Sequence, residues 1–295
     1  MNERDLRMNA EPLAPGLYLT ATPIGNARDI TLRALDVLRS ADVLVAEDTR
    51  TLRKLLDIHG ISLGNRAIFA HHDHSNAKAR DGIVRLIVDG KSVAYCSDAG
   101  SPLIADPGFE LVQAIHQAGL KVTVLPGASS VVAALSIAGI PTDRFCFLGF
   151  APKQGSARRK FLREANDIPA TLVIFETAKR VSGLLEEMCE ELGETRIAGL
   201  GRELTKRFEE MRRGTLAQLH SSVQIDPPKG EIVLIVDRGA PKVVSDEEID
   251  AALTMALSNG SMRDAVDQVT RELGAPRRAV YQRGLALGRE EGREV

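Results

Sequence analysis

The stretches TATPIGNARDITLRAL (residues 20–35) and CSDAGSPLIADPG (residues 96–108) decide the fold of this chain. In each, an apolar, β-branched run ends abruptly in Gly, Pro and small polar residues, and an apolar-periodic segment follows. In both stretches, this pattern predicts a strand, then a ligand-binding loop, then a helix. Such loops expose backbone N–H groups at helix N-termini, where anionic ligand groups bind. We therefore expect the chain to hold a small-molecule cofactor.

The same alternation extends on both sides of these loops. Strand-like runs alternate with segments of helical periodicity. The runs are residues 17–22, 43–46, 92–97 and 121–125, and the helical segments are 31–40, 50–59, 77–89 and 108–118. Strict alternation of this kind predicts a mostly parallel sheet with helices on both faces.

The rest of the chain divides into two further parts. After a helix at 131–138, strands near 171–175, 196–200 and 231–237 indicate a second α/β unit. From Pro241 no strand is visible, and Ser245 with Glu248 forms a capping box ahead of helices at about 246–258, 262–273 and 277–288. We therefore expect four segments, namely a flexible tail (1–14), an N-terminal α/β domain (15–126), a second α/β domain (127–240) and a helical domain (241–295).

Composition excludes several classes of protein. The chain has 295 residues, of which 44% are hydrophobic, so it can bury a full core. No apolar stretch reaches the ~18 residues of a membrane-spanning helix, and the N-terminus lacks a signal peptide, so we expect a cytoplasmic protein without membrane contact. Cys96, Cys146 and Cys189 form no CxxC pair, which predicts buried reduced thiols. A net charge of −2 gives no overall attraction to nucleic acid.

Familiar catalytic signatures are absent. The sequence contains no GxxxxGKS/T, no GxGxxG opening a helix and no GxSxG elbow, which argues against kinases, dinucleotide-dependent dehydrogenases and α/β-hydrolases. What remains are the loops TPIGN, DAGSP, PGASS, GRELTK and KGEIV, of which four lie at strand boundaries. Ligands of open α/β sheets bind beyond the carboxyl ends of the strands. Each loop could be a plain turn, but together they predict one ligand cleft.

These loops resemble a known motif series. TATPIGNARDITLRAL, AEDTRTLRKLL, SDAGSPLIADPG, LPGASSVVAAL, GFAPK, GRELTK and KGEIV are similar, in order and spacing over roughly residues 15–239, to the tetrapyrrole methylase superfamily and to a branch of it that methylates ribosomal RNA. The resemblance implies a class III S-adenosylmethionine (SAM) methyltransferase with two α/β domains, a cofactor cleft between them and a small C-terminal helical domain. It also implies a homodimer that methylates the ribose 2′-oxygen of a cytidine in the decoding region of 16S ribosomal RNA, within the small ribosomal subunit.

The resemblance also implies which residues hold SAM. This cofactor needs backbone donors, a carbonyl-lined path and an apolar slot, which the loops supply. By family analogy the cofactor-binding residues are Ile24, Gly25, Ser101, Ile104, Ser129, Ser130, Leu204, Gly230 and Glu231. Ser101 and Ser129 also fit a role as helix N-caps. Asp98 and Asp106 fit either turn formation or substrate orientation.

Methyl transfer to a ribose hydroxyl depends chiefly on alignment, with a carboxylate or lysine assisting proton removal. The catalytic candidates are Glu176, Asp98, Glu203 and Lys206. FETAKR (residues 175–180) stands where a sequence like YESPHR is expected in the family, so no tyrosine hydroxyl or histidine acts there. Glu176 and Arg180 therefore become stronger candidates for a role at the site, although they also fit a structural ion pair.

RNA contact is predicted from local charge. The acid-free stretch after GFAP contains Lys153, Arg158, Arg159, Lys160 and Arg163, which also fits a solvated helix face. The C-terminal arginines, Arg277 and Arg278 among them, lie in a layout typical of a helix-turn-helix with a basic second helix. Only 4% of residues are aromatic, which favours recognition of phosphate and shape over base stacking.

Three points stay open in the sequence. AEDTRTLRKLL (46–56) fits an N-capped helix start or a cleft edge. In the cluster His71, His72, Asp73 and His74, only His72 and His74 share a face of an extended segment, so we expect no metal site. The function could instead be methylation of a tetrapyrrole or of the diphthamide precursor, or RNA binding without catalysis. The basic segments argue against the first alternative and the complete set of loops against the second.

Overall fold

The computed structural model describes residues 12–72, 77–239, 245–258 and 260–290. The chain forms two compact units, Met1–Asp237 and Arg238–Val295. The first unit contains two lobes, each built on its own five-stranded sheet. Within the described residues, no helix is both long enough and apolar enough to cross a membrane.

The first lobe is a parallel sheet in the order β3-β2-β4-β1-β5. Its strands are β1 (Gly16–Thr20), β2 (Val43–Ala46), β3 (Ile68–Ala70), β4 (Ser92–Cys96) and β5 (Val122–Leu125). All four strand pairs are parallel, and the register places Thr20 beside both Cys96 and Leu125. The carboxyl ends of β1, β4 and β5 therefore meet at one edge. The expected parallel sheet is confirmed, and β3 is an addition to it.

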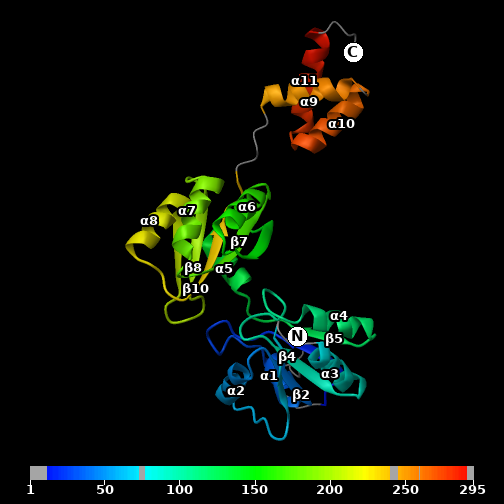
Figure 1. Cartoon of the computed structure of the whole chain (residues 1–295), viewed down its shortest axis with the longest axis vertical. Helices are drawn as coiled ribbons and strands as arrows, with labels where there is room; N and C mark the ends of the chain where they lie inside the picture. The colour runs from blue at the N-terminus through cyan, green and yellow to red at the C-terminus, as the bar shows by residue number, and fades with distance from the viewer. Residues whose placement is uncertain (1–11, 73–76, 240–244, 259, 291–295) are drawn as a thin grey trace, which may run out of the picture. The chain divides into compact units, whose positions relative to one another are not determined.

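Helices cover both faces of this sheet (Figure 1). They are α1 (Leu32–Ser40), α2 (Thr49–Ile58), α3 (Ala77–Val88) and α4 (Phe109–Gln117). One buried cluster lies under α1 and α2, and another lies under α3 and α4. Burial on both faces explains why the central strands read as continuous apolar runs. Cys96 lies in this core, where burial raises the pKa of its thiol to about 12, as expected for an inert reduced thiol. Cys146 and Cys189 are free as well, but they are only partly buried, so the expected burial is wrong for these two.

Side-chain caps determine where two of these helices begin. Thr31 accepts a hydrogen bond from the Ala34 N–H, and Asp48 accepts one from the Arg50 N–H. Each cap satisfies a backbone donor that has no partner inside its helix. The predicted starts of these two helices differ from the observed ones by a single residue.

The second lobe is built on a mixed sheet in the order β6-β7-β10-β8-β9. Its elements are α5 (Ser130–Ala138), β6 (Phe145–Phe150), α6 (Gly155–Asn166), β7 (Thr171–Thr177), α7 (Val181–Leu192), β8 (Ile197–Arg202), β9 (Glu210–Thr215), α8 (Leu216–Ile225) and β10 (Glu231–Val236). Only β6 and β7 are parallel, and the other pairs are antiparallel. Ile174 and Leu234 face the core under α6, α7 and α8, while Val173 and Val233 face α5. Ile24 of the first lobe packs into the α5 cluster and so joins the two lobes.

The second unit contains the helices α9 (Asp246–Leu257), α10 (Met262–Leu273) and α11 (Arg277–Glu290) around a small apolar core. The capping box is confirmed, since Ser245 and Glu248 exchange both hydrogen bonds. Gly274 ends α10 at φ 65°, in the left-handed region that favours glycine. The domain boundaries expected from the sequence remain predictions, and most of the expected tail lies outside the described residues.

Candidate functional site

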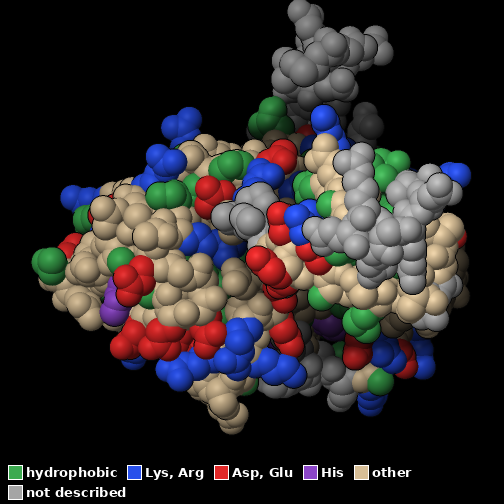
Figure 2. Space-filling view, turned by 90° about the horizontal axis from the view of Figure 1, so that it is seen from above, with side chains coloured by type: hydrophobic (Ala, Val, Ile, Leu, Met, Phe, Trp, Pro, Cys, Tyr) green, Lys and Arg blue, Asp and Glu red, His purple; other side chains and the backbone are tan. Residues whose placement is uncertain are grey.

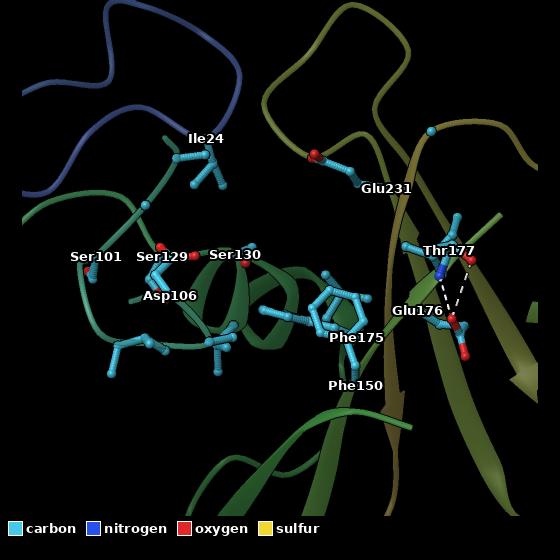
Figure 3. A pocket seen from close by; sticks show the side chains of 18 residues that line it. Ile24, Ser101, Asp106, Ser129, Ser130, Phe150, Phe175, Glu176, Thr177 and Glu231 are labelled. Carbon is cyan, nitrogen blue, oxygen red and sulfur yellow. Dashed lines mark hydrogen bonds between the residues drawn. The ribbon is translucent and has the colours of Figure 1, made fainter. Parts of the chain in front are cut away.

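Four of the five loops predicted to bind a ligand line one cavity of about 370 Å³ between the two lobes. GRELTK, with Leu204, does not line it, and Gly25 lines a second cavity instead. Ile24, Ser101, Ile104 and Asp106 come from the first lobe (Figure 3). Ser129 and Ser130 lie where the chain passes to the second lobe. The other wall consists of Phe150, residues 175–177 and residues 230–233. The cavity is therefore formed at the carboxyl ends of β1, β4 and β5, where the loop pattern places a ligand.

The first wall is held in shape by backbone contacts. Thr22 and Gly100 exchange both N–H···O bonds, at 2.9 and 3.0 Å, which ties the TPIGN loop to the DAGSP loop. Gly100 has φ 82°, and Leu103 and Ala105 also adopt left-handed conformations, at 72° and 62°. Non-glycine residues in this region store strain that a fixed loop must compensate. Residues 98–106 thus form a turn that faces the cavity and carries backbone strain.

The two serines of the cavity have different local roles. Ser129 is the N-cap of α5, so the alternative role expected for it, as a helix N-cap, is confirmed. Ser101 is not an N-cap, because α4 begins only at Phe109 with Gly108 as its cap. The Ser101 hydroxyl instead donates to the carbonyl of Ala128 at 3.4 Å. The N-terminus of α5 opens toward the cavity, and unpaired N–H groups there attract a carboxylate.

The second wall is apolar and aromatic. Phe175 packs edge-on against Phe147 and Phe150, with ring centroids 4.7 and 5.5 Å away. Ile232 and Val233 complete this surface. Phe175 replaces the expected tyrosine, and its ring lies on the cavity side of β7 (Figure 3). A flat apolar slot of this kind fits a purine ring.

The GRELTK and KGEIV loops form an ionic clamp beside the cavity. The Lys206 ammonium donates to Glu203 Oε1 at 3.0 Å and to Glu231 Oε2 at 2.9 Å, and the Glu231 N–H donates to Glu203 Oε1 at 3.1 Å. The backbone hydrogen bond from Glu231, with Lys206, lowers the pKa of Glu203. Burial disfavours the Lys206 charge, but the hydrogen bonds to Glu231 and Glu203 outweigh it and raise its pKa. Both groups stay ionised and paired at neutral pH, which is a poor state for Lys206 as a base.

Two glycines allow these loops to approach closely. A Cβ at Gly230, where φ is 87°, would lie 2.2 Å from Glu203 Oε1. A Cβ at Gly25 would lie 2.4 Å from Lys206 Cγ. The Asn26 N–H also donates to Thr205 Oγ1 at 3.1 Å, so the TPIGN loop of one lobe rests on the GRELTK loop of the other. Leu204 is buried in this contact.

Glu176 is in the wall of the cavity, but its carboxylate points the other way (Figure 3). The side chain is 0% exposed, and Oε2 lies 3.0 Å from the Arg180 guanidinium. Oε1 accepts the Thr177 N–H at 2.7 Å. Arg180 also donates to the carbonyls of Ala151 and Pro152, at 2.6 and 3.1 Å. This geometry favours the structural ion pair over a catalytic base, because the pair connects the end of β7 to the loop after β6.

Asp98 belongs to a second cavity, of about 190 Å³. Its Oδ1 accepts the Asp48 N–H at 3.0 Å, and the other walls come from the TPIGN loop and from Lys54, Leu55 and Ile58 of α2. The segment 46–56 is therefore both an N-capped helix start and a cleft edge. Arg50, Arg53 and Lys54 are exposed at i, i+3 and i+4 of α2. Sequence reasoning missed this cationic row, although its spacing was a usable signal.

No metal site is present in the part of the chain that the structure describes, where no group of three or more His, Cys, Asp or Glu side chains could hold an ion. Asp73 and His74 lie outside the described residues. His71 is buried and packs edge-on against Tyr95, at 5.7 Å between ring centroids.

The basic residues on α6 pair with acidic side chains, three of them on α7 and one on α6 itself. Arg158 makes a two-pronged pair with Glu187, at 2.6 and 2.7 Å. Arg159 pairs with Glu190, Lys160 with Glu164 and Arg163 with Glu191. Over the visible face in Figure 2, blue and red side chains lie side by side in the same way. RNA contact by this stretch stays a prediction, with exposed Lys153, Arg159, Lys160 and Arg163 better placed than Arg158, whose side chain is 14% exposed.

The Arg158–Glu187 pair makes stability depend on pH. The hydrogen bond from Arg158 lowers the pKa of Glu187, so the pair stabilises the fold above the ordinary carboxyl pKa of about 4.3 and stops doing so as pH falls through the lower folded value. We expect Glu187→Gln to lower the melting temperature at pH 7 by a few degrees, since hydrogen bonds between charged groups contribute about 1.5–3 kcal/mol. The difference from wild type should shrink below about pH 4. Exposed Glu186, changed to Gln, is the matched control in thermal melts across pH, and a difference that persists unchanged in acid would contradict the assignment.

The C-terminal unit also contains both arginines held in ion pairs and an exposed arginine. Arg277 donates to Asp267 at 2.7 Å, and Arg283 pairs with Asp250 and Asp246. Arg278 is exposed. The predicted role of Arg277 and Arg278 in binding RNA stays a prediction, and Arg278 has the more accessible charge.

Comparison with known protein families gives two matches along the chain. Residues 16–220 match the model described as "Tetrapyrrole (Corrin/Porphyrin) Methylases". Residues 243–288 match the "RsmI C-terminal HTH domain". The first model covers the first lobe and most of the second, and the second model covers the helical unit.

Similar proteins agree with this division. The chain is 45% identical over 281 residues (95% of this chain, 98% of the relative) to a protein of Erythrobacter litoralis, and 43% identical over 279 residues (94% of each) to one of Mesorhizobium japonicum. Both relatives are called "Ribosomal RNA small subunit methyltransferase I". Among solved structures, the methyltransferase CobJ matches with a TM-score of 0.58 at 18% identity (78% and 97% covered). Uroporphyrin-III C-methyl transferase from Thermus thermophilus, complexed with S-adenyl homocysteine, matches at 0.51 and 20% identity (75% and 97% covered), which shows a shared fold.

Proposed function

Because this chain belongs to the tetrapyrrole (corrin/porphyrin) methylase family, we propose that it transfers a methyl group from SAM to the ribose 2′-oxygen of a cytidine in the decoding region of 16S ribosomal RNA. The main support for this proposal is the sequence identity of 43–45% to ribosomal RNA small subunit methyltransferases over 94–95% of the chain, including the appended helical unit. The chain is thus a SAM-dependent ribosomal RNA methyltransferase.

The cavity between the lobes fits SAM part by part. The α5 N-terminus with Ser129 and Ser130 suits its carboxylate, and the Phe175 wall suits its adenine. Ile24, Ser101, Ile104, Gly230 and Glu231 line the same cavity. Gly25 and Leu204 act indirectly, because they permit the contact between the TPIGN and GRELTK loops.

When bound, SAM supplies an activated methyl group, so the protein has chiefly to hold the ribose oxygen in line with it. Three of the four catalytic candidates are engaged elsewhere. Glu176 pairs with Arg180, and Glu203 and Lys206 pair with each other. Asp98 accepts a hydrogen bond from the Asp48 N–H through Oδ1, but it is exposed beside the second cavity, adjoining Gly100 and Ser101 of the first. We therefore assign proton removal or ribose orientation to Asp98 before the others.

The alternatives receive less support. Enzymes of tetrapyrrole biosynthesis such as CobJ share the fold at 18% identity, which carries no information about substrate. The helical unit matches the model of the RsmI C-terminal domain. A non-catalytic RNA-binding protein would have no need of the strained DAGSP loop and the fitted cavity.

The proposal includes a partner and a setting. The substrate is 16S ribosomal RNA in the small ribosomal subunit, in the cytoplasm. We propose a homodimer because large apolar side chains are exposed on α5 and on β5 and β6, each of which is an edge strand of its sheet; they are Val124, Val132, Ile137 and Phe145. Exposed apolar patches are typical of protein interfaces.

The test is methyl transfer to small ribosomal subunits from a strain lacking this gene. With SAM, the purified protein should add one methyl group to one RNA fragment, and mass spectrometry of the nucleosides should place it on a cytidine ribose. Methyl transfer to tetrapyrroles with untouched RNA would overturn the proposal.

Truncation after Gly239 tests the helical unit. Because its arginines are proposed to bind phosphate, the truncated protein should bind SAM normally but methylate subunits at least about tenfold more slowly, with a shallower dependence of binding on salt. Calorimetry and filter binding across salt concentrations measure the two effects. A wild-type methylation rate in the truncated protein would mean that the unit does not bind substrate.

A further inference from the structure

A third cavity, of about 320 Å³, lies beyond the cofactor cavity and shares Gly230 with it. Its other lining residues are Arg202, Glu203, Phe208 and Lys229. Phe208 follows the GRELTK loop and leads into β9, and it is 61% exposed. An aromatic ring thus stands in the open next to the cofactor cavity, in a chain with few aromatic residues.

The backbone holds this ring outward. The Thr205 N–H donates to Glu209 Oε2 at 2.6 Å, and the Arg202 Nε donates to the Phe208 carbonyl at 3.3 Å. Glu203 and Thr205 adopt left-handed conformations at φ 47° and 64°. Strained non-glycine residues persist only where surrounding contacts fix them. The exposure of Phe208 is therefore built into a fixed loop.

Two cations lie beside the ring. The Arg207 guanidinium lies over the Phe208 ring, 5.5 Å from its centroid. Lys229 lines the cavity. Of the acidic groups nearby, Glu203 and Glu231 share the ammonium of Lys206, Glu210 pairs with Arg202 and Arg212, and Glu209 accepts the Thr205 N–H. The site therefore offers one aromatic face and two cations.

We propose that Phe208 stacks on an unpaired base of the ribosomal RNA that neighbours the methylated nucleotide, with Arg207 and Lys229 on the adjacent phosphates. This inference rests on the function proposed above. A π-face flanked by cations is the arrangement with which proteins bind single-stranded nucleic acid, and it accepts any base. Because the two cavities share Gly230, a base stacked on Phe208 lies next to the cofactor cavity. Stacking therefore holds the substrate strand along that cavity.

The experiment compares Phe208→Leu, Phe208→Trp and wild type in methylation of small subunits. Leu keeps apolar bulk but has no π-face, so KM for the subunit should rise roughly 5- to 150-fold while kcat, SAM affinity and melting temperature stay unchanged. Trp should restore KM. Lys229→Gln should raise KM and reduce the salt slope of binding by about one. Phe109→Leu is the matched control, because Phe109 is 69% exposed on α4.

Each result decides between readings. A wild-type KM in Phe208→Leu overturns the stacking site, and so does weaker SAM binding, which would assign the ring to the cofactor, or a changed oligomeric state, which would assign it to a subunit interface. Absence of any ribosomal RNA methylation by wild type would instead overturn the proposed function itself.

Discussion

Ser101→Trp should abolish SAM binding without unfolding the protein. Ser101 lines the cofactor cavity between the DAGSP loop and α5, and its hydroxyl makes one long hydrogen bond, to the Ala128 carbonyl. An indole there would occupy much of a cavity of about 370 Å³. We expect SAM affinity to fall by at least about 100-fold, or about 2.8 kcal/mol, because the cofactor and the ring need the same space.

Calorimetry with SAM, beside a thermal melt, measures this effect. Ser101→Ala is the control, since it removes the hydroxyl but keeps the space, and it should bind SAM within a few-fold of wild type. Unchanged SAM affinity in a folded Ser101→Trp protein would mean that the cofactor binds elsewhere.

Glu176→Ala should have a larger effect on stability than on chemistry. The substitution removes the ion pair with Arg180, which is 24% exposed and keeps its bonds to two carbonyls, and it leaves the Thr177 N–H without its acceptor. We therefore expect a cost of about 3 kcal/mol, the lower end for breaking a buried pair. In a unit of this size the melting temperature should fall by roughly 10 °C. The rate of a single turnover, at saturating substrates and below both melting temperatures, should stay within a few-fold of wild type, since the carboxylate points away from the cavity.

Two further variants sharpen this result. Glu176→Gln keeps an acceptor for the Thr177 N–H and should lose less stability than Ala, while Lys179→Ala, at an exposed position, should change neither property. A rate reduced on the order of 100-fold in a fully stable Glu176→Ala protein, together with loss of the acidic limb of the pH profile, would identify Glu176 as the base after all.

The first lobe could be predicted nearly element by element because its signals are local. Buried parallel strands read as apolar runs, and Gly or Pro marks their ends. Only Ile68–Ala70 was missed, since three half-exposed residues give no periodicity. In the second lobe, the edge strand Glu210–Thr215 was missed because its sequence, EMRRGT, is mostly polar. Its polar side chains form ion pairs, as between Arg212 and Glu210.

The candidate site was predictable as a set of loops but not as a geometry. Parallel strands bring their carboxyl ends to one edge, so the joint cavity follows from the fold class. Successive residues of β7 point to opposite faces of the sheet, and both faces are buried. The sequence of this strand therefore shows no alternation of apolar and polar residues from which the side of Glu176 could be predicted. The pairing of Arg158 with Glu187 joins two helices across 29 residues, which no local charge count reveals.

The passage between the lobes has a mechanical consequence. Among the described residues of 12–237, the chain crosses from one lobe to the other only once, at residues 126–129 between β5 and α5. The Asn26–Thr205 hydrogen bond and the packing of Ile24 into the α5 cluster join the lobes elsewhere. The two walls of the cofactor cavity are thus joined covalently at one end, beside Ser129, and by non-covalent contacts at the other. Loss of those contacts would leave the crossing at residues 126–129 to hold the two walls at their spacing.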